Sequence, residues 1–120
     1  MKLEFRRLKA EEIEVRIGQV KQGAGFSLLL YKDSRCDMAM LDEAVGAMNW
    51  KCRFEMVRDT MFCYIAIWDD EKQQWVEKGN AGAKAEMEEI KSEASDALKR
   101  ASTTWGIGRE LYNTPFIWIK

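Results

Sequence analysis

The chain of 120 residues contains no histidine, one proline and an odd number of cysteines, three. Without histidine it cannot assemble a Ser-His-Asp or Cys-His catalytic arrangement, a histidine-ligated zinc site or the commonest general base. The cysteines Cys36, Cys52 and Cys63 form no C-x-x-C pair, so neither a disulfide framework nor a zinc site is indicated. Their apolar neighbours predict reduced thiols in or near the core. We therefore expect a protein that is not an enzyme and has no metal or cofactor.

Nucleotide-binding loops are also missing. Residues 79–84, G-N-A-G-A-K, have the wrong spacing for the G-x-x-x-x-G-K-[ST] phosphate loop, and Ala85 stands where a metal-binding hydroxyl is needed. Gly106 and Gly108 follow no predicted strand and lack a third glycine, which excludes the dinucleotide fingerprint. The sequence predicts no ATP hydrolysis.

No hydrophobic run approaches the length of about 20 residues that a membrane-spanning helix needs. The first residues, M-K-L-E-F-R-R, lack the apolar stretch of a signal peptide. We therefore expect no membrane contact and a cytoplasmic protein. The hydrophobic fraction of 47%, with five Trp, five Phe and three Tyr, is enough for one folded domain over residues 1–120.

Charge is distributed unevenly along the chain. The net charge is −1 and the pI is near 5.6, which by itself argues against a nucleic-acid partner. However, bases outnumber acids in residues 1–35 and 91–120, whereas acids dominate residues 59–90. Basic ends and an acidic middle give local fields that matter more than the sum.

Hydrophobic periodicity predicts an α+β fold in which an antiparallel β-β-β meander packs on one long α-helix, after an N-terminal strand or hairpin and a short helix. The expected elements are a strand at 14–21, a turn at 22–25, a strand or buried extended segment at 26–31, a helix capped by Asp33 or Ser34 and ending at Gly46, strands at 50–57, 61–68 and 74–78, a flexible link at 79–82 and a helix over about 84–105. The apolar tail 115–119 requires a partner edge, either within the domain or on a neighbouring subunit.

The long helix carries the clearest candidate binding surface. Its apolar positions recur every three or four residues, so at about 100° per residue Lys99 and Arg100 fall on the opposite side, flanking Ser92 and Thr103. Adjacent cations over small hydroxyl residues suit a phosphate backbone. The competing interpretation is an amphipathic surface helix whose cations complement its macrodipole.

Further cations and aromatic residues surround this helix in the expected fold. Lys51 and Arg53 share one face of a strand, because side chains alternate, and a groove between that sheet and the helix is expected. Trp50 and Tyr64 are candidates for base contacts, with core packing as the alternative. The candidate DNA-binding residues are Lys99, Arg100, Arg35, Lys91, Lys51, Arg53, Arg109 and Tyr31.

Three segments together resemble a known family. L-L-Y-K-D-S-R at 29–35, L-D-E-A-V-G-A-M-N-W at 41–50 and S-D-A-L-K-R-A followed by W-G-I-G-R-E-L-Y, within 95–112, are similar to the Rad52/Sak family of phage single-strand annealing proteins, whose distant relatives are eukaryotic recombination mediators. The resemblance extends from about Val15 to Ile119.

This resemblance implies a β-β-β-α core that assembles into rings or helical filaments. It also implies that single-stranded DNA lies in a positively charged groove and that annealing needs no ATP. Lys99 and Arg100 match the family's paired cations, and Arg35 matches its arginine at the first helix. Single-stranded DNA, further copies of the chain and a host single-strand-binding protein are the partners expected, in the host cytoplasm if the protein is phage-encoded.

Two other functions remain open at this stage. A β-β-β-α arrangement also suits a double-stranded-RNA-type binding module without annealing activity. Alternatively, the apolar tail and the acidic meander would serve a protein-interaction domain that binds no nucleic acid.

Overall fold

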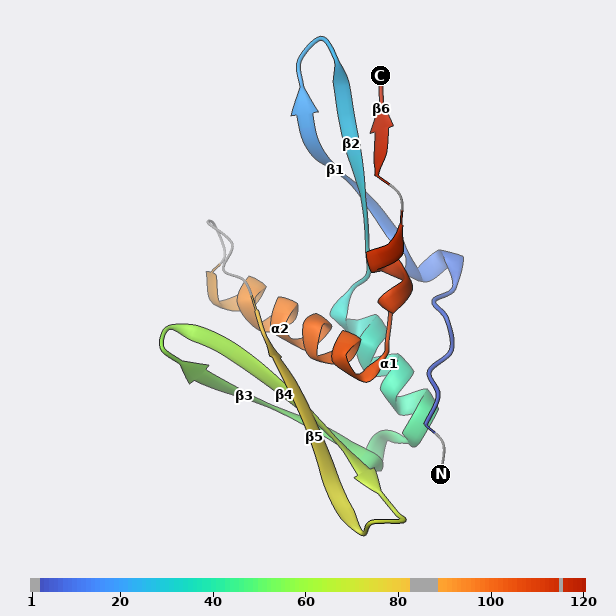
Figure 1. Cartoon of the computed structure of the whole chain (residues 1–120), viewed down its shortest axis with the longest axis vertical. Helices are drawn as coiled ribbons and strands as arrows, with labels where there is room; N and C mark the ends of the chain where they lie inside the picture. Colours follow the sequence, from blue (N-terminus) through green and yellow to red (C-terminus); the bar gives the residue numbers. More distant parts are fainter. Residues whose placement is uncertain (1–2, 83–88, 115) are drawn as a thin grey trace.

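Two three-stranded antiparallel sheets flank a pair of helices in the computed structural model of the protein, which describes residues 3–82, 89–114 and 116–120 (Figure 1). The hairpin sheet has the order β1-β2-β6, and the central sheet has the order β3-β4-β5. The strands are β1 (Glu14–Lys21), β2 (Gly25–Tyr31), β3 (Trp50–Val57), β4 (Thr60–Asp69), β5 (Gln74–Ala81) and β6 (Ile117–Ile119). The helices are α1 (Ser34–Val45) and α2 (Glu89–Trp105), with short 3₁₀ segments η1 (Ala10–Glu12), η2 (Ala47–Asn49) and η3 (Arg109–Asn113).

The hairpin sheet projects away from the helices and lengthens the molecule to 59 Å (Figure 1). The radius of gyration is 16.3 Å, above the value of about 14 Å expected for a compact chain of this length. Strand β6 pairs antiparallel with Phe26–Leu28 of β2. The sequence left open whether the apolar tail pairs within the domain or with a neighbouring subunit. In the structure it pairs within the domain.

The central sheet is built from two consecutive hairpin connections. Arg58 and Asp59 adopt positive φ angles of 49° and 64°, as a two-residue type I′ turn between right-twisted strands requires. Helix α2 lies against one face of this sheet, and the indole Nε1 of Trp105 donates a hydrogen bond of 2.9 Å to the carbonyl of Ile65. The buried residues at and around this contact are Met40, Leu41, Cys63, Ile65, Ile67, Ala97, Leu98, Ala101 and Ile107.

Helix α1 begins and ends where the sequence predicts. The Asp33 carboxylate caps the helix by accepting a hydrogen bond from the Arg35 backbone at 2.9 Å, which satisfies one free amide of the first turn. Gly46 ends the helix with a φ of 90°, a conformation that favours glycine.

The N-terminal segment is fastened to this helix by charge. The Arg6 guanidinium contacts the carboxylates of Glu12 at 2.7 Å and Glu43 at 3.0 Å. The hydrogen bond from Arg6, together with one from the Lys9 backbone, lowers the pKa of Glu12 to about 2. One arginine therefore ties the residues preceding β1 to α1.

The α+β class is confirmed, but the arrangement differs from the expected one in three respects. Strand β6 returns to β2 from the far end of the chain, so the N-terminal hairpin becomes a second three-stranded sheet. Residues 79–81 belong to β5 and are not a flexible link, since their backbone pairs with β4. Cys52 is exposed, unlike the half-buried Cys36 and the buried Cys63. The predicted start of the long helix, 84–88, falls outside the described residues.

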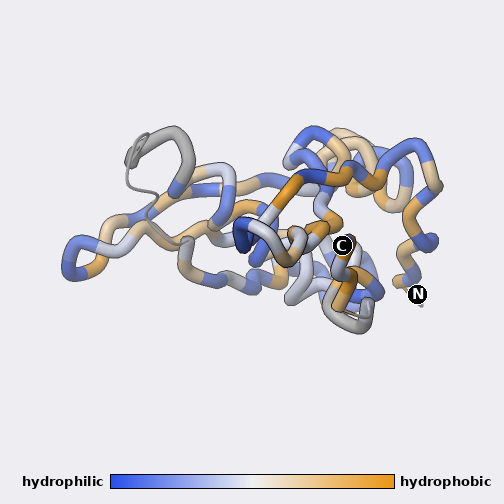
Figure 2. Tube along the Cα trace, turned by 90° about the horizontal axis from the view of Figure 1, so that it is seen from above, coloured by the Kyte–Doolittle hydropathy of each residue, from blue (hydrophilic) through white to orange (hydrophobic). Residues whose placement is uncertain are grey.

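Hydrophobic and hydrophilic residues are interspersed along the strands and helices, which gives the elements two-sided character (Figure 2). Within the described residues, no helix has both the length and the hydropathy needed to cross a membrane.

Candidate nucleic-acid interface

Helix α2 presents opposite sides to the core and to the solvent. Ala97 and Ala101 are fully buried against the central sheet, and their small side chains allow a close approach. A Cβ at Gly82 would collide with the Glu93 carbonyl of α2, so the chain just beyond β5 also runs close to the helix. This seating turns Arg100 and Thr103 outward, as the helical period predicts.

A first hollow of about 260 Å³ lies between the hairpin sheet and α2. Three cations contribute to its wall, against one carboxylate, that of Asp96. The residues lining it are Arg16, Leu30, Tyr31, Lys32, Asp96, Lys99, Thr103, Gly108 and Leu111. The excess of cations makes this hollow suitable for an anion.

Tyr31 lies within reach of two of these cations. The Arg16 guanidinium carbon is 5.5 Å from the centre of the tyrosine ring, and the Lys99 ammonium is 5.9 Å from it. Both distances are within the range of cation–π attraction. The ring therefore holds an arginine of β1 and a lysine of α2 at the same place, although these residues are far apart in the sequence.

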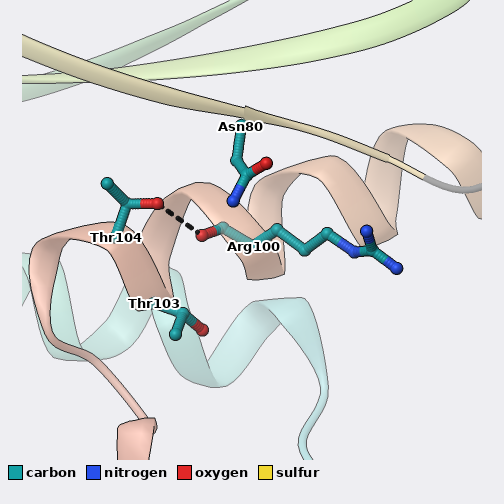
Figure 3. A pocket seen from close by; sticks show the side chains of 4 residues that line it. All are labelled: Asn80, Arg100, Thr103 and Thr104. Atoms are coloured by element: carbon teal, nitrogen blue, oxygen red, sulfur yellow. Dashed lines mark hydrogen bonds between the residues drawn. The ribbon is translucent and has the colours of Figure 1, made fainter.

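A second hollow of about 420 Å³ lies between β5 and α2. It is lined by Asn80, Arg100, Thr103 and Thr104, and Asn80 reaches from β5 toward the helix (Figure 3). The Arg100 guanidinium contacts Asp96 at 3.0 Å. Side-chain amide, hydroxyl and guanidinium groups offer hydrogen-bond donors to phosphate oxygens.

Thr103 lines both hollows, so together they form one strip across the outer side of α2. Lys99 lies on one flank of Thr103 and Arg100 on the other, as the sequence predicted. The two cations nevertheless do not line the same hollow. Because neighbouring helical residues differ by about 100° in direction, Lys99 lines the first hollow and Arg100 the second. We call this strip the α2 groove.

Two further predicted cations lie on or beside α2. Arg35 is exposed in the first turn of α1 and lines neither hollow. Its neighbour Ser34 accepts a hydrogen bond of 3.3 Å from Ser95 of α2, one turn before Lys99. Lys91 belongs to α2, and its side chain lies outside the described residues.

Lys51 and Arg53 share one strand face, as predicted, but it is the face turned away from α2. They pair with Ala66 and Tyr64, whereas Cys63, Ile65 and Ile67 face the helix. Arg53 also forms ion pairs with Glu77 at 2.9 Å and Glu55 at 3.0 Å, and hydrogen bonds to both raise its pKa above the ordinary value. The structure does not bring these two cations into the α2 groove.

Arg109 occupies the end of α2. Its Nε and Nη2 donate hydrogen bonds of 2.9 and 2.8 Å to the carbonyls of Thr103 and Thr104. The last carbonyls of a helix lack partners within it, and a cation there also complements the macrodipole. The geometry thus makes Arg109 a helix cap.

A comparison with protein-family models identifies the family of this chain. Residues 1–119 match the model of the Rad52/22 family of double-strand break repair proteins. The chain belongs to this family. A search of curated proteins finds no match.

Membership in this family places the chain in DNA repair and recombination. A role in DNA repair is consistent with the α2 groove as the candidate interface, because the groove gathers cations at the surface. Among the described residues, no three Cys, Asp or Glu side chains are grouped so that they could hold a metal ion.

Sequence reasoning missed several residues that line the α2 groove, among them Arg16, Lys32 and Asn80. Arg16 and Lys32 are distant from α2 in the sequence and reach it only because the hairpin sheet is anchored beside the helix. Asn80 was assigned to a flexible link. The strand pattern of residues 74–78 extends only weakly into G-N-A at 79–81, and it was the available signal.

The capping role of Arg109 gives a test of stability. We expect Arg109→Ala to lower the free energy of unfolding by about 1–2 kcal/mol, because two carbonyls lose a charged donor. Arg109→Lys keeps the charge but cannot bond to both carbonyls. Its free energy of unfolding should therefore lie between those of the wild type and Arg109→Ala. Thermal denaturation measures the effect. A wild-type melting temperature for both variants would contradict the cap.

Proposed function

We propose that this member of the Rad52/22 family binds single-stranded DNA along the α2 groove and anneals complementary strands in homologous recombination and repair. We further propose that it does so without ATP, as an oligomer of many copies. The observation that carries the proposal is the strip of cations and hydroxyl groups formed by the two hollows, which share Thr103.

The groove supplies both kinds of contact that a single strand needs. Lys99, Arg16 and Arg100 provide cations for the sugar-phosphate backbone, which accounts for most affinity and carries no sequence information. Tyr31 provides an aromatic ring beside them, and stacking on such rings tolerates any base. This combination favours binding that is independent of sequence, as an annealing protein requires.

The other predicted cations take different places in the proposal. Arg35 extends the path of the strand toward the first turn of α1, and Lys91 of α2 stays a candidate contact. Lys51 and Arg53 lie outside it, on the far face of the central sheet. Arg109 contributes by fixing the end of α2 on which the groove is built.

Annealing does not require a fuel. Pairing and stacking of the two strands release free energy, so the protein needs to hold one strand extended and to reduce repulsion between phosphates. Cations of the groove perform the second task. The chain's lack of a phosphate loop supports a mechanism without nucleotide hydrolysis.

Many short contacts become effective when copies stand side by side. One domain covers only a few nucleotides, and linking many sites raises the effective concentration of each. Two candidate surfaces for such a contact belong to different sheets. Phe116 beside β6 is 77% exposed, and a hollow lined by Ile67, Val76, Trp105 and other residues opens at the central sheet. A contact between unlike surfaces of successive copies can close into a ring.

The groove itself is tested by removing its two helical cations. We expect Lys99→Ala with Arg100→Ala to weaken binding of oligothymidylate about tenfold or more, because charged hydrogen bonds to phosphate are lost. The slope of log affinity against log salt should become shallower by roughly 0.7 for each lost contact. Fluorescence anisotropy at several salt concentrations measures both quantities.

A matched control removes the same two residue types from the other side of the sheet. Lys51→Ala with Arg53→Ala should change affinity much less and leave the slope nearly unaltered. If both double variants behave alike, binding reflects overall charge and not the α2 groove. Duplex DNA and duplex RNA in the same assay separate the annealing proposal from a duplex-RNA module, and no binding of any nucleic acid would favour a protein-interaction domain.

Assembly is tested at Phe116. Phe116→Ser should shift the protein toward monomers in light scattering and reduce annealing more than it reduces binding of a short oligonucleotide, since the exposed ring would lose its contact with the next copy. Met48→Ser is the control, because Met48 is 88% exposed but belongs to η2, outside the hairpin sheet, and does not line the hollow at the central sheet. A wild-type protein that is monomeric with and without DNA would contradict the proposed assembly.

A further inference from the structure

Directly behind the first hollow lies a buried ion pair that the proposed function has not used. The Lys32 ammonium is 2.6 Å from Oδ1 of Asp37, and these side chains are 5% and 0% exposed. Neither carboxylate oxygen receives a hydrogen bond of standard geometry from the described residues. The carboxylate is therefore held mainly by charge, and burial of such a group is costly unless it is compensated.

Local packing keeps Lys32 in this position. Gly108 has a φ of 71°, and a Cβ there would collide with Cε of Lys32. The second glycine of W-G-I-G therefore provides the space through which the lysine stem passes. Asp37 itself lies in the first turn of α1, close to the caps of that helix. The fold thus places one negative charge immediately behind a wall of cations.

Charges from several elements act on this carboxylate. Lys32 and Lys99 favour its ionised form, whereas Asp33 opposes it. Cys36 is a near neighbour, and its thiol pKa is raised to about 11, mainly by burial. Arg16 and Asp96 complete the charged groups around the hollow.

We propose that Asp37 and a backbone phosphate are alternative counter-ions for the cations of the first hollow, so that seating DNA there makes the Asp37 carboxylate take up one proton. The proton comes from the solvent and converts the carboxylate to a neutral carboxyl, with no other bond changed. This proposal rests on the proposed function and names Asp37 as a positioning residue for the cations that contact DNA.

The direction of the effect follows from linkage. Burial already raises the pKa of Asp37 to about 6 in the free protein, despite the opposing effects of Lys32 and Lys99. A phosphate beside the same cations disfavours the ionised carboxylate further, so the complex binds more protons than the free protein. Affinity for DNA therefore rises as the pH falls toward 6, and it levels off once Asp37 is protonated in both states. Each tenfold gain corresponds to a rise of about one pKa unit on binding.

The chain suits this measurement because it has no histidine. Another group expected to titrate in the same pH range is Cys52, whose pKa is lowered to about 7 by a hydrogen bond from Cys63. It lies in the central sheet, away from the first hollow, and Cys52→Ser removes it. Oligothymidylate is the appropriate probe, since its bases do not titrate between pH 5 and 8.

The experiment is titration calorimetry of full-length protein with oligothymidylate near pH 6.5, in buffers of different ionisation enthalpy. The dependence of heat on buffer gives the protons taken up. We expect uptake of a substantial fraction of one proton per occupied groove, in wild type and Cys52→Ser alike. Binding with no net uptake overturns this inference, whereas no binding at all contradicts the proposed function instead.

Two variants separate the role of Asp37 from general charge. Asp37→Asn should abolish the uptake and bind with an affinity independent of pH, close to that of wild type at low pH. Asp96→Asn removes the same charge from the wall of the hollow and should retain the uptake. If Asp37→Asn does not fold, the wild-type calorimetry still decides, because it requires no variant. Unchanged uptake in folded Asp37→Asn would also overturn the proposal.

Discussion

The seating of α2 on the central sheet is the constraint on which the rest of the structure depends. Ala97 and Ala101 are buried completely, and the Trp105 indole is hydrogen-bonded to the sheet backbone, so the helix cannot rotate about its axis without opening the core. Fixing this rotation also fixes the direction of Lys99 and Arg100. The binding surface is therefore a consequence of packing, and its cations need no contact of their own to be aimed at solvent.

The hairpin sheet depends on the same constraint. It makes few contacts with the core, yet Tyr31 at its base lies close to both Arg16 and Lys99, and Gly108 after α2 leaves room for Lys32. A projecting element thus becomes one wall of the first hollow. Charge is balanced within this wall by Asp37, which allows several cations to be gathered in one place in the free protein.

Local patterns predicted much of the fold. Alternation identified β1 and β3 with their correct bounds, and capping residues identified both ends of α1. Pairing of β6 with β2 could not be predicted, because it joins residues about ninety positions apart in the register and local pattern is silent on such contacts. The sequence also did not show which face of the central sheet packs against α2. Strand β4 is apolar on both faces, so its pattern does not tell whether Tyr64 or Ile65 faces the helix. That ambiguity put Lys51 and Arg53 beside the groove in the prediction and leaves them on the opposite face in the structure.

Photocrosslinking tests the location of the DNA most directly. Oligothymidylate is irradiated in complex with the wild-type protein, and crosslinked peptides are identified by mass spectrometry. A strand in the α2 groove predicts crosslinks to the peptide that contains Tyr31 and to the segment from Lys99 to Thr104. Crosslinks confined to the outer face of the central sheet, at Tyr64 and Trp75, would contradict the account.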